Sequence, residues 1–360
     1  MSTLKPTEMG AVRQLRFTEA VLEATDLCME ADASVHVLGL GVADPIGIFG
    51  TTAGLADKYG HDRVMETPTA ENGSLGIALG GSLVGLRPII THQRVEFALL
   101  AIDQIVNQAA KWNYMTGGRV SAPIVIRLIV GRGWGQGPQH SQSLESWFAH
   151  IPGLRVVLPS TPNDAKGLLI SSVRDNNPVV FIEHRWLHDT FGEVPRGIYQ
   201  VPLGEARVAR QGRDITIVSY SYMTVEALKC ADALAEQGID VEVLDLRSLR
   251  PLDEAAVLSS VRKTGRLLAL DLGWSKFGVS SEVIALAAMD GTVSFKGPPE
   301  RLGVIDTPIP STRALADLAY PGSRQIADRV LHMLGEEAGS AIDRLPHVTD
   351  IPDPGFRGPF

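Results

Sequence analysis

The sequence predicts an α/β protein with two doubly wound sheet domains. Short, almost wholly apolar segments, such as 123–130 and 266–272, are typical of strands buried in a parallel sheet. They alternate with longer segments whose apolar residues recur three and four positions apart, as on a helix. This alternation occurs twice, on either side of an irregular stretch near residue 200. The 360 residues are enough for two cores.

The first half of the chain contains four segments with helical spacing: 11–30, 71–86, 97–114 and 163–175. Strands are expected between them, over residues 35–42, 87–90, 123–130, 154–160 and 178–184. The helix over 71–86 is rich in glycine, which costs about 1 kcal/mol relative to alanine in a helix interior. We therefore expect the backbone of this helix to pack closely against a ligand or a neighbouring helix.

The second half repeats the alternation. Strands are expected over 214–220, 241–246, 266–272 and 301–306, and helices over 223–237, 252–262, 280–288 and 324–334. Gly238 is expected to end the first of these helices. The sequence thus predicts a first domain over 1–190, a linker over 191–212 and a second domain over 213–335. Proline and glycine are frequent after residue 335, so 336–360 is expected to be an irregular tail.

The composition excludes several classes of protein. The chain carries a net charge of -8 and has no Lys/Arg run, which disfavours binding to nucleic acid or an anionic membrane. No apolar run approaches the roughly 18 residues of a membrane span, and the first residues lack a signal-peptide core. We therefore expect a cytoplasmic location. The two cysteines, Cys28 and Cys230, lie far apart in helical patterns and are expected to be buried thiols.

Two polar residues stand out beside glycine-rich segments. Glu71 begins the glycine-rich helix, where the helix dipole favours a carboxylate, but a simple capping acid remains an alternative. His140 lies in the loop over 131–143, GRGWGQGPQHSQS, and is a candidate acid or base, although many loop histidines have no such role. This loop lacks the Gly-Lys-Ser/Thr ending of a phosphate loop and does not match the dinucleotide fingerprint.

Four long segments carry a resemblance to a known family. They are RVMETPTAENGSLGIALGGSLVGLRPI, AIDQIVNQAAKWNYMTGG, GPQHSQSLESWFAHIPGLRVVLPSTPNDAKGLLISSVRDNNPVVFIE and VEVLDLRSLRPLDEAAVLSSVRKTGRLLALD. The chain resembles, from Arg13 to Leu334, the β subunits of the pyruvate and branched-chain 2-oxo acid dehydrogenase decarboxylating components. This resemblance implies a thiamine-diphosphate pyrimidine-binding domain followed by a transketolase C-terminal-like domain.

The resemblance also implies an activity and partners. The chain is expected to be the β subunit of a thiamine-diphosphate-dependent 2-oxo acid dehydrogenase, active with an α subunit in a heterotetramer and passing its acyl group to a lipoyl-bearing acyltransferase. Mg²⁺ is expected mainly on the α subunit, and this sequence lacks the GDG motif that holds it. One alternative is half of a split transketolase-like or acyloin-type carboligase without a lipoyl acceptor. Another is a non-catalytic binding subunit.

The family match assigns roles to individual residues. Glu71 matches the glutamate that hydrogen-bonds and activates the cofactor, and His140 matches an active-site loop histidine, so both are expected to be catalytic. Cofactor binding is expected of Thr69, Glu71, Gln93 and Phe97, with Phe97 packing on the pyrimidine ring. A structural potassium site is expected at Ile124, Ser172, Asp175 and Asn177.

Three features depart from the family pattern. Leu40 stands where relatives carry a glutamate that belongs to an acidic tunnel between cofactors. Arg94 stands where relatives often have an aromatic residue. Three roles are open for it: it faces an anionic group of the substrate, it faces an acid of the partner, or it simply forms a salt bridge at an interface. The segment DLGWSKFGVSS also differs from the family's acidic, glycine-rich loop. These changes predict a divergent member whose 2-oxo acid and acyl acceptor are not defined by the sequence.

Overall fold

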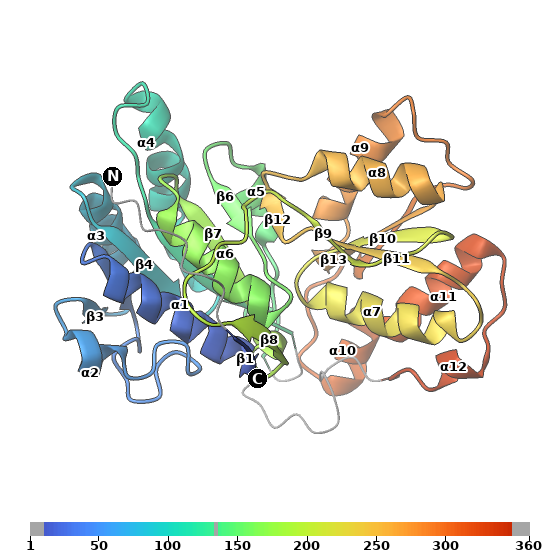
Figure 1. The fold of residues 1–360 in the computed structure, drawn as a ribbon, viewed down its shortest axis with the longest axis horizontal. Coiled ribbons are helices and arrows are strands. Elements are labelled where there is room, and N and C mark those ends of the chain that lie inside the picture. The colour runs from blue at the N-terminus through green and yellow to red at the C-terminus, as the bar shows by residue number, and fades with distance from the viewer. Residues whose placement is uncertain (1–10, 133–135, 348–360) are drawn as a thin grey trace. The chain divides into compact units, whose positions relative to one another are not determined.

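The computed structural model describes residues 11–132 and 136–347. The chain forms two compact units, each of α/β type (Figure 1). The first unit comprises Met1–Val130 and Trp147–Leu203, and the second comprises Gly131–Ser146 and Gly204–Phe360. The predicted fold class is therefore confirmed. Within the described residues no helix is both long and apolar enough to cross a membrane, and the cytoplasmic location stays a prediction.

The first unit contains eight strands among its described residues: β1 (Val12–Arg16), β2 (Val35–Gly39), β3 (Val64–Glu66), β4 (Arg87–His92), β5 (Val125–Val130), β6 (Arg155–Val157), β7 (Val179–His184) and β8 (Phe191–Pro195). Its helices are α1 (Phe17–Ala31), α2 (Leu55–Tyr59), α3 (Glu71–Leu83), α4 (Ala110–Met115) and α6 (Pro162–Arg174), with the 3₁₀ helices η1 (Phe97–Ala101) and η3 (Arg185–Leu187) and the π helix η2 (Gln104–Ala109). Helix α5 (Glu145–His150) crosses the boundary between the two units in the sequence.

Six strands of the first unit lie side by side in one sheet in the order β6-β7-β5-β4-β2-β3, and all of these neighbours are parallel. The connection after β2 leads to β3 on one side, whereas the connection after β4 leads to β5 on the other. A crevice therefore opens between the carboxyl ends of β2 and β4, the place where open α/β sheets bind ligands. Helices α1 and α6 pack together, and α3 packs against β4 and η1.

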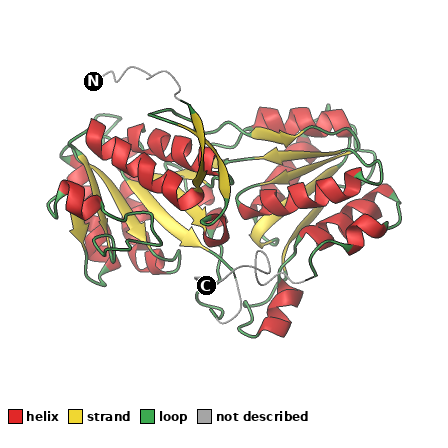
Figure 2. Cartoon of the chain, turned by 60° about the horizontal axis from the view of Figure 1, so that its bottom comes forward, coloured by secondary structure: helices red, strands yellow, loops and turns green. Residues whose placement is uncertain are grey.

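The second unit contains a sheet with the order β14-β13-β10-β11-β9. The strands of this sheet are β9 (Arg207–Arg210), β10 (Ile215–Ser219), β11 (Val241–Asp245), β13 (Leu267–Trp274) and β14 (Glu300–Val304), and the short strand β12 (Ser248–Arg250) is not part of it. The helices of the second unit are α7 (Tyr222–Ala235), α8 (Glu254–Thr264), α9 (Val279–Met289), α10 (Arg313–Ala319), α11 (Ser323–Leu334) and α12 (Ser340–Asp343). Helices α8 and α9 lie on one side of this sheet and α7 and α11 on the other (Figures 1 and 2).

Three expectations from the first half are corrected by the structure. The helix expected over 11–30 begins only at Phe17, because Val12–Arg16 pairs antiparallel with β8. The helix expected over 97–114 is broken into η1, η2 and α4. The strand expected over 87–90 continues to His92, because β4 pairs on both sides with β2 and β5. Pairing with distant segments overrides the local pattern in the first and third cases.

The linker and the tail are more ordered than the sequence suggested. Strand β8 lies within the predicted linker over 191–212 and pairs with β1, and β9 in the same stretch pairs with β11. Helix α12 lies within the predicted irregular tail, and residues 348–360 of that tail fall outside the described residues. Both cysteines are free and buried, as predicted, and burial raises the pKa of the Cys28 thiol to about 12.

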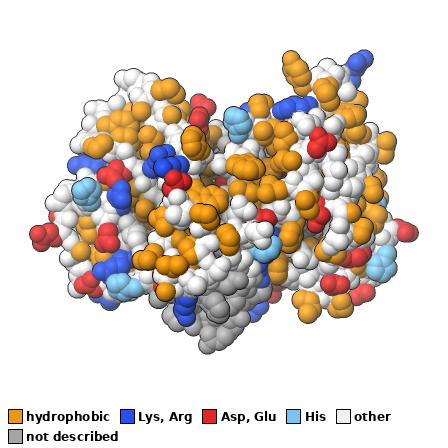
Figure 3. Space-filling model, turned by 180° about the vertical axis from the view of Figure 1, so that it is seen from behind, with side chains coloured by type: hydrophobic (Ala, Val, Ile, Leu, Met, Phe, Trp, Pro, Cys, Tyr) orange, Lys and Arg blue, Asp and Glu red, His pale blue; other side chains and the backbone are white. Residues whose placement is uncertain are grey.

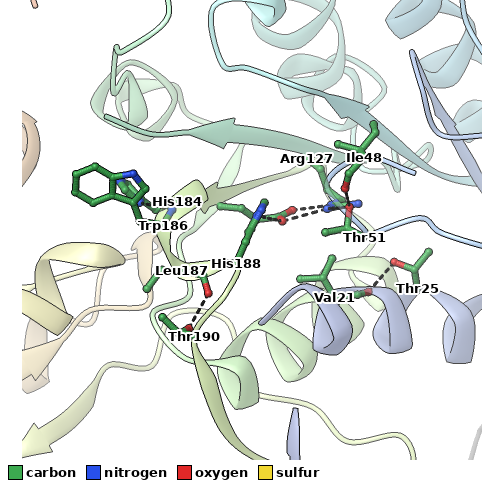
Figure 4. A network of polar contacts seen from close by, with 11 residues as sticks. Val21, Thr25, Ile48, Thr51, Arg127, His184, Trp186, Leu187, His188 and Thr190 are labelled. Atoms are coloured by element: carbon green, nitrogen blue, oxygen red, sulfur yellow. Dashed lines mark hydrogen bonds and ion pairs between the residues drawn. The ribbon is translucent and has the colours of Figure 1, made fainter. Parts of the chain in front are cut away.

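A buried ionic network lies inside the first unit (Figure 4). Arg127 on β5 binds Glu183 on β7 through two hydrogen bonds, Nε to Oε1 at 2.7 Å and Nη2 to Oε2 at 3.1 Å. The same Nη2 donates to Thr51 Oγ1 at 2.9 Å, and His188 Nε2 lies 3.2 Å from Glu183 Oε2. Burial alone raises the pKa of Glu183, but the positive charge of Arg127 and the hydrogen bonds lower it to about 2.

The second unit buries two acids, Glu145 and Asp271, whose pKa values are not lowered by any basic side chain of the described residues. The hydroxyl of Tyr220, the residue directly after β10, lies 2.8 Å from Glu145 Oε1 and 3.3 Å from Asp271 Oδ1, and it accepts from Leu272 N at 3.1 Å. Ser280 donates to Asp271 through both its backbone N–H and its hydroxyl. Burial raises the pKa of Glu145 to about 7 and that of Asp271 to about 6. Both acids therefore keep their protons to a higher pH than free carboxyl groups do.

Candidate active site

A pocket opens at the carboxyl ends of β2 and β4 in the first unit. It lies at the crevice where the connections after these two strands leave in opposite directions. Its lining combines apolar surface with a small number of polar groups, which is typical of a small-molecule site. The lining residues are Gly39, Leu40, Thr67, Pro68, Glu71, Ser74, Ile90, Thr91, His92, Gln93 and Phe97.

The loop after β2 forms one wall of this pocket, and two side chains from other strands hold it. Glu66, the last residue of β3, accepts hydrogen bonds from the backbone N–H groups of Gly41 and Ala43. Gln93 donates from Nε2 to the carbonyl oxygen of Leu40 at 3.0 Å. These bonds fix the loop from both neighbouring strands.

Glycine is required at the start of this loop. Gly39 has a φ of +154°, and a Cβ atom there would lie 2.6 Å from the carbonyl oxygen of Thr91. Gly41 has a φ of +80°, in the left-handed region that residues with a Cβ seldom adopt. The glycines therefore allow the loop to turn tightly against β4, with Leu40 between them lining the pocket.

Glu71 enters the pocket from the N-terminus of α3. It is half-buried, and it is the first helical residue after Ala70, whose side chain forms no capping hydrogen bond. The positive end of the helix dipole stabilises a carboxylate at this position. The structure thus places this acid in the same pocket as Phe97 and Gln93, as the family match implies, and its catalytic role stays a prediction.

The other predicted cofactor-binding residues fall into two groups. Gln93 and Phe97 both line the pocket: Gln93 directly follows β4, and Phe97 begins η1. Thr69 is exposed and is not among the residues that line the pocket, although its neighbour Pro68 is. Three of the four predicted residues are therefore brought together.

His92 is a pocket residue that the sequence reasoning missed. It is the last residue of β4, only 6% exposed, and its Nε2 is buried without a hydrogen-bond partner among the described residues. Burial lowers the pKa of His92 to about 4, so the ring is neutral near pH 7. The neighbouring Thr91 Oγ1 is also buried without a partner there. A strand predicted to end at Ile90 gave no reason to examine either residue.

His140 lies in the second unit, on the loop before α5. It is half-buried, and its proposed catalytic role stays a prediction. The start of this loop is anchored by Arg132, which donates from Nη1 to the carbonyl oxygen of Pro321 at 3.0 Å. The same guanidinium lies over the rings of Tyr222 and Tyr320, at 5.4 and 4.9 Å from their centroids.

The residues of the predicted potassium site already take part in bonds within the chain. The carbonyl oxygen of Ile124 accepts from Val179 N at 2.9 Å, and Ser172 donates to the carbonyl of Leu168. The Asp175 carboxylate pairs with Arg155 at 2.7 Å and accepts from both Asn177 N and Asn177 Nδ2. The potassium site stays a prediction. The described residues contain no cluster of three or more His, Cys, Asp or Glu that could hold a metal ion.

Arg94 and Arg185 create a positive region in the first unit. Burial lowers the pKa of both, and the charge of Arg94 lowers that of Arg185 further, to about 10. The Arg185 guanidinium lies 4.3 Å from the centroid of the Phe49 ring, and Glu96 acts in the opposite sense on the pKa of Arg94. The role of Arg94 towards a substrate or a partner stays a prediction.

The fold and the pocket define a protein of the two-domain transketolase type. Residues 13–189 match the family described as the transketolase pyrimidine binding domain, and residues 204–326 match the transketolase C-terminal domain. The residues that line the pocket with Glu71 all fall within the first match. His140 falls within it too, but in the structure this residue belongs to the second compact unit. The two matches together account for most of the chain.

Similarity to individual proteins narrows the family. The β subunit of acetoin:2,6-dichlorophenolindophenol oxidoreductase from Cupriavidus necator is 42% identical over 325 residues, covering 88% of this chain and 96% of that protein. Subunit beta-2 of the mitochondrial pyruvate dehydrogenase E1 component from Oryza sativa subsp. japonica is 41% identical over 316 residues, covering 87% and 84%. The chain belongs to the family of these β subunits.

A solved structure supports the architecture. A chain described as "Split gene transketolase, inactive beta4 tetramer" superimposes with a TM-score of 0.72 at 21% identity, covering 91% of this chain and all of that one. At this identity the likeness shows the fold alone. It confirms the fold of two α/β domains that the sequence predicted.

Proposed function

We propose that this chain is the β subunit of a thiamine-diphosphate-dependent 2-oxo acid dehydrogenase, which works with an α subunit and passes its acyl group to a lipoyl-bearing acyltransferase. One observation carries the proposal: Glu71, Gln93 and Phe97 line a single pocket at the carboxyl edge of the pyrimidine-domain sheet. The relatives at about 40% identity include E1 β subunits of pyruvate dehydrogenase.

The pocket residues fit the pyrimidine part of the cofactor. A flat heterocycle with polar edges needs an aromatic or apolar face and groups that form hydrogen bonds at its rim. Phe97 and Ile90 offer apolar surface, Glu71 offers a carboxyl group, and His92 Nε2 is a buried polar atom without a partner among the described residues. When bound, thiamine diphosphate supplies the electron sink that decarboxylation of a 2-oxo acid requires.

Each pocket residue then has a task. Glu71, which lines the pocket from the N-terminus of α3, would hold a proton between its carboxyl oxygen and a ring nitrogen of the pyrimidine. Phe97 packs on the ring. Gln93 acts indirectly, because its amide fixes the Leu40 carbonyl and so the loop after β2 that lines the pocket. His140 is proposed to transfer a proton or to orient the substrate.

Exposed apolar residues on the surface of the chain favour an interface with another subunit. Figure 3 shows apolar side chains gathered over wide areas of one face of the molecule. Among the exposed apolar residues, Ile77 on α3 is 71% exposed, Val84 just after α3 is 84% exposed and Leu100 on η1 is 68% exposed. Apolar side chains on elements that build the pocket suit an interface with another subunit. We assign the diphosphate and Mg²⁺ sites to this α subunit.

The names of the relatives also favour a second substrate class. Two of the similar β subunits, from Cupriavidus necator and Bacillus subtilis, belong to acetoin oxidoreductases. Acetoin is a 2-hydroxyketone, so cleavage and oxidation of such a compound at the same site is the second candidate. A carboligase without a lipoyl acceptor, the alternative from the sequence, has less support than either.

The test is reconstitution of the chain with its α subunit. Turnover of pyruvate, branched 2-oxo acids and acetoin is measured with an artificial electron acceptor, with and without thiamine diphosphate and Mg²⁺. We expect cofactor-dependent turnover only in the pair, and a loss of at least 100-fold in Glu71→Gln, since general acid–base groups contribute about that much. Transfer to a lipoyl domain is then assayed separately. A correctly assembled pair that neither binds the cofactor nor turns over would contradict the proposal.

A further inference from the structure

The pocket contains a polar side chain that the proposed mechanism does not use. His92 closes β4 at the pocket, and 94% of its surface is hidden, since it is 6% exposed. Its Nε2 is buried and has no hydrogen-bond partner among the described residues. Buried polar atoms are almost always satisfied in folded proteins, so each exception requires an explanation.

The strand geometry directs this ring to the pocket. Side chains two positions apart on a strand point to the same face of a sheet, so Ile90 and His92 share a face, and both line the pocket. His92 lies beside Leu128 of β5 in the sheet register, and Leu128 is fully buried and apolar. The sheet therefore offers the ring no partner on that side.

The charge state of the ring suits binding to a neutral heterocycle. Burial lowers the pKa of His92 to about 4, which leaves the imidazole uncharged at physiological pH. A neutral imidazole has one nitrogen that donates and one that accepts, so it pairs with either edge of a nitrogen heterocycle according to its tautomer. It brings no second charge beside the carboxyl group of Glu71 in the same pocket.

We propose that His92 is a ligand-binding residue whose Nε2 forms a hydrogen bond with the amino-substituted nitrogen heterocycle that occupies this pocket. The ligand supplies the partner that the folded chain lacks. This inference rests on the proposed function, in which that heterocycle is the pyrimidine of thiamine diphosphate. It adds a contact from β4 to those of Glu71 on α3 and Phe97 on η1.

The test compares cofactor binding and stability in two His92 variants and a control variant of the full chain, each assembled with its α subunit. His92→Phe keeps an aromatic ring but removes both nitrogens, and His92→Gln places an amide near the position of Nε2. We expect His92→Phe to raise the Kd for thiamine diphosphate about tenfold, the worth of one hydrogen bond at a buried site. His92→Gln is expected to recover part of this loss.

The ligand-free melting temperature separates binding from folding. Replacing an unsatisfied buried imidazole by an apolar ring is expected to leave the Tm of His92→Phe unchanged or higher. His36→Phe is the matched control: His36 lies on β2, and its Nδ1 is 2.9 Å from the Ser34 carbonyl, outside the pocket lining. We expect that variant to lose stability and to keep its Kd.

Two results would contradict the assignment of His92 and leave the proposed function intact. One is wild-type affinity in a folded His92→Phe while Glu71→Gln binds weakly. The other is a lower ligand-free Tm in His92→Phe, which would mean that the folded chain already satisfies the ring. If the folded wild-type pair does not bind thiamine diphosphate with Mg²⁺, the proposed function fails, and the assignment of His92 fails with it.

Discussion

Glu183 in the first unit and Glu145 in the second are both almost completely buried, yet their pKa values move in opposite directions. Glu183 is held by the bidentate Arg127 and has a pKa near 2, whereas Glu145 faces Tyr220 and Asp271 and has a pKa near 7. Burial raises the pKa in both cases. The presence of a cation within the same cluster decides the direction of the shift, so the first unit contains a buried ion pair and the second contains buried acids with raised pKa values.

Removing the cation is the strongest way to break this comparison. In Arg127→Leu the Glu183 carboxylate is left buried without its counter-charge, which typically costs 3–5 kcal/mol, so we expect a loss of about 4 kcal/mol in the free energy of unfolding. Urea denaturation of the full chain measures it. The double variant with Glu183→Leu is expected to recover much of the loss.

The control for this prediction is a surface pair. Arg213 pairs with Asp240 at 2.8 Å but is largely exposed, so Arg213→Leu is expected to leave the urea midpoint close to that of the wild type. Equal losses in Arg127→Leu and Arg213→Leu would contradict the idea that burial of the ion pair matters.

The two acids give stability opposite pH dependences. The raised pKa of Glu145 means that its contribution is fully present below about pH 4, where it is protonated in both states, and is lost as the pH rises towards 7. The lowered pKa of Glu183 means that its contribution is present above about pH 5 and is lost as the pH falls towards 2.

Glu145→Gln isolates the first of these effects. The amide cannot ionise, so the fall in unfolding free energy between pH 4.5 and 7, on the order of 2 kcal/mol, is expected to flatten. Urea midpoints of wild type and variant across this pH range measure the difference. If the unfolding free energies of the wild type and of Glu145→Gln change by the same amount between pH 4.5 and 7, the prediction is wrong. Glu145 would then already be ionised in the folded protein.

The smallest expected effect concerns the hydroxyl between the two acids. Tyr220→Phe removes the group that accepts from Leu272 N and contacts both Glu145 and Asp271. A buried donor left without its acceptor costs roughly 1–3 kcal/mol, so we expect a loss of about 1 kcal/mol. The slope of stability against pH is expected to change as well, because both acids lose the Tyr220 hydrogen bond that lowers their pKa values. A variant with wild-type stability at every pH would contradict this role.

Much of the fold could be predicted because its strands are encoded locally. The apolar run that became β5 and the segment that became β13 are buried on both faces, so their composition alone indicates a parallel sheet. Val12–Arg16 could not be identified in this way. Its strand conformation depends on pairing with β8, almost 180 residues away in the sequence, and its own spacing is equally compatible with a helix.

The site was less predictable from local sequence than the fold was. Local sequence left Glu71 open to a capping role, and only the family resemblance joined it to Gln93 and Phe97, which the structure places in the same pocket. His92 could not be found, because the local pattern ended the strand two residues early and the segments that carry the family resemblance do not include that position. The contribution of an α subunit is not encoded in this chain at all.

The loop after β2 has a consequence for how tightly a ligand binds. Ordering a flexible segment on binding costs conformational entropy, and that cost is subtracted from the affinity. Glu66 and Gln93 already fix the backbone of this loop through bonds to Gly41, Ala43 and Leu40. The wall of the pocket is thus preorganised by the chain itself, and the interaction energy of an arriving ligand is available for affinity.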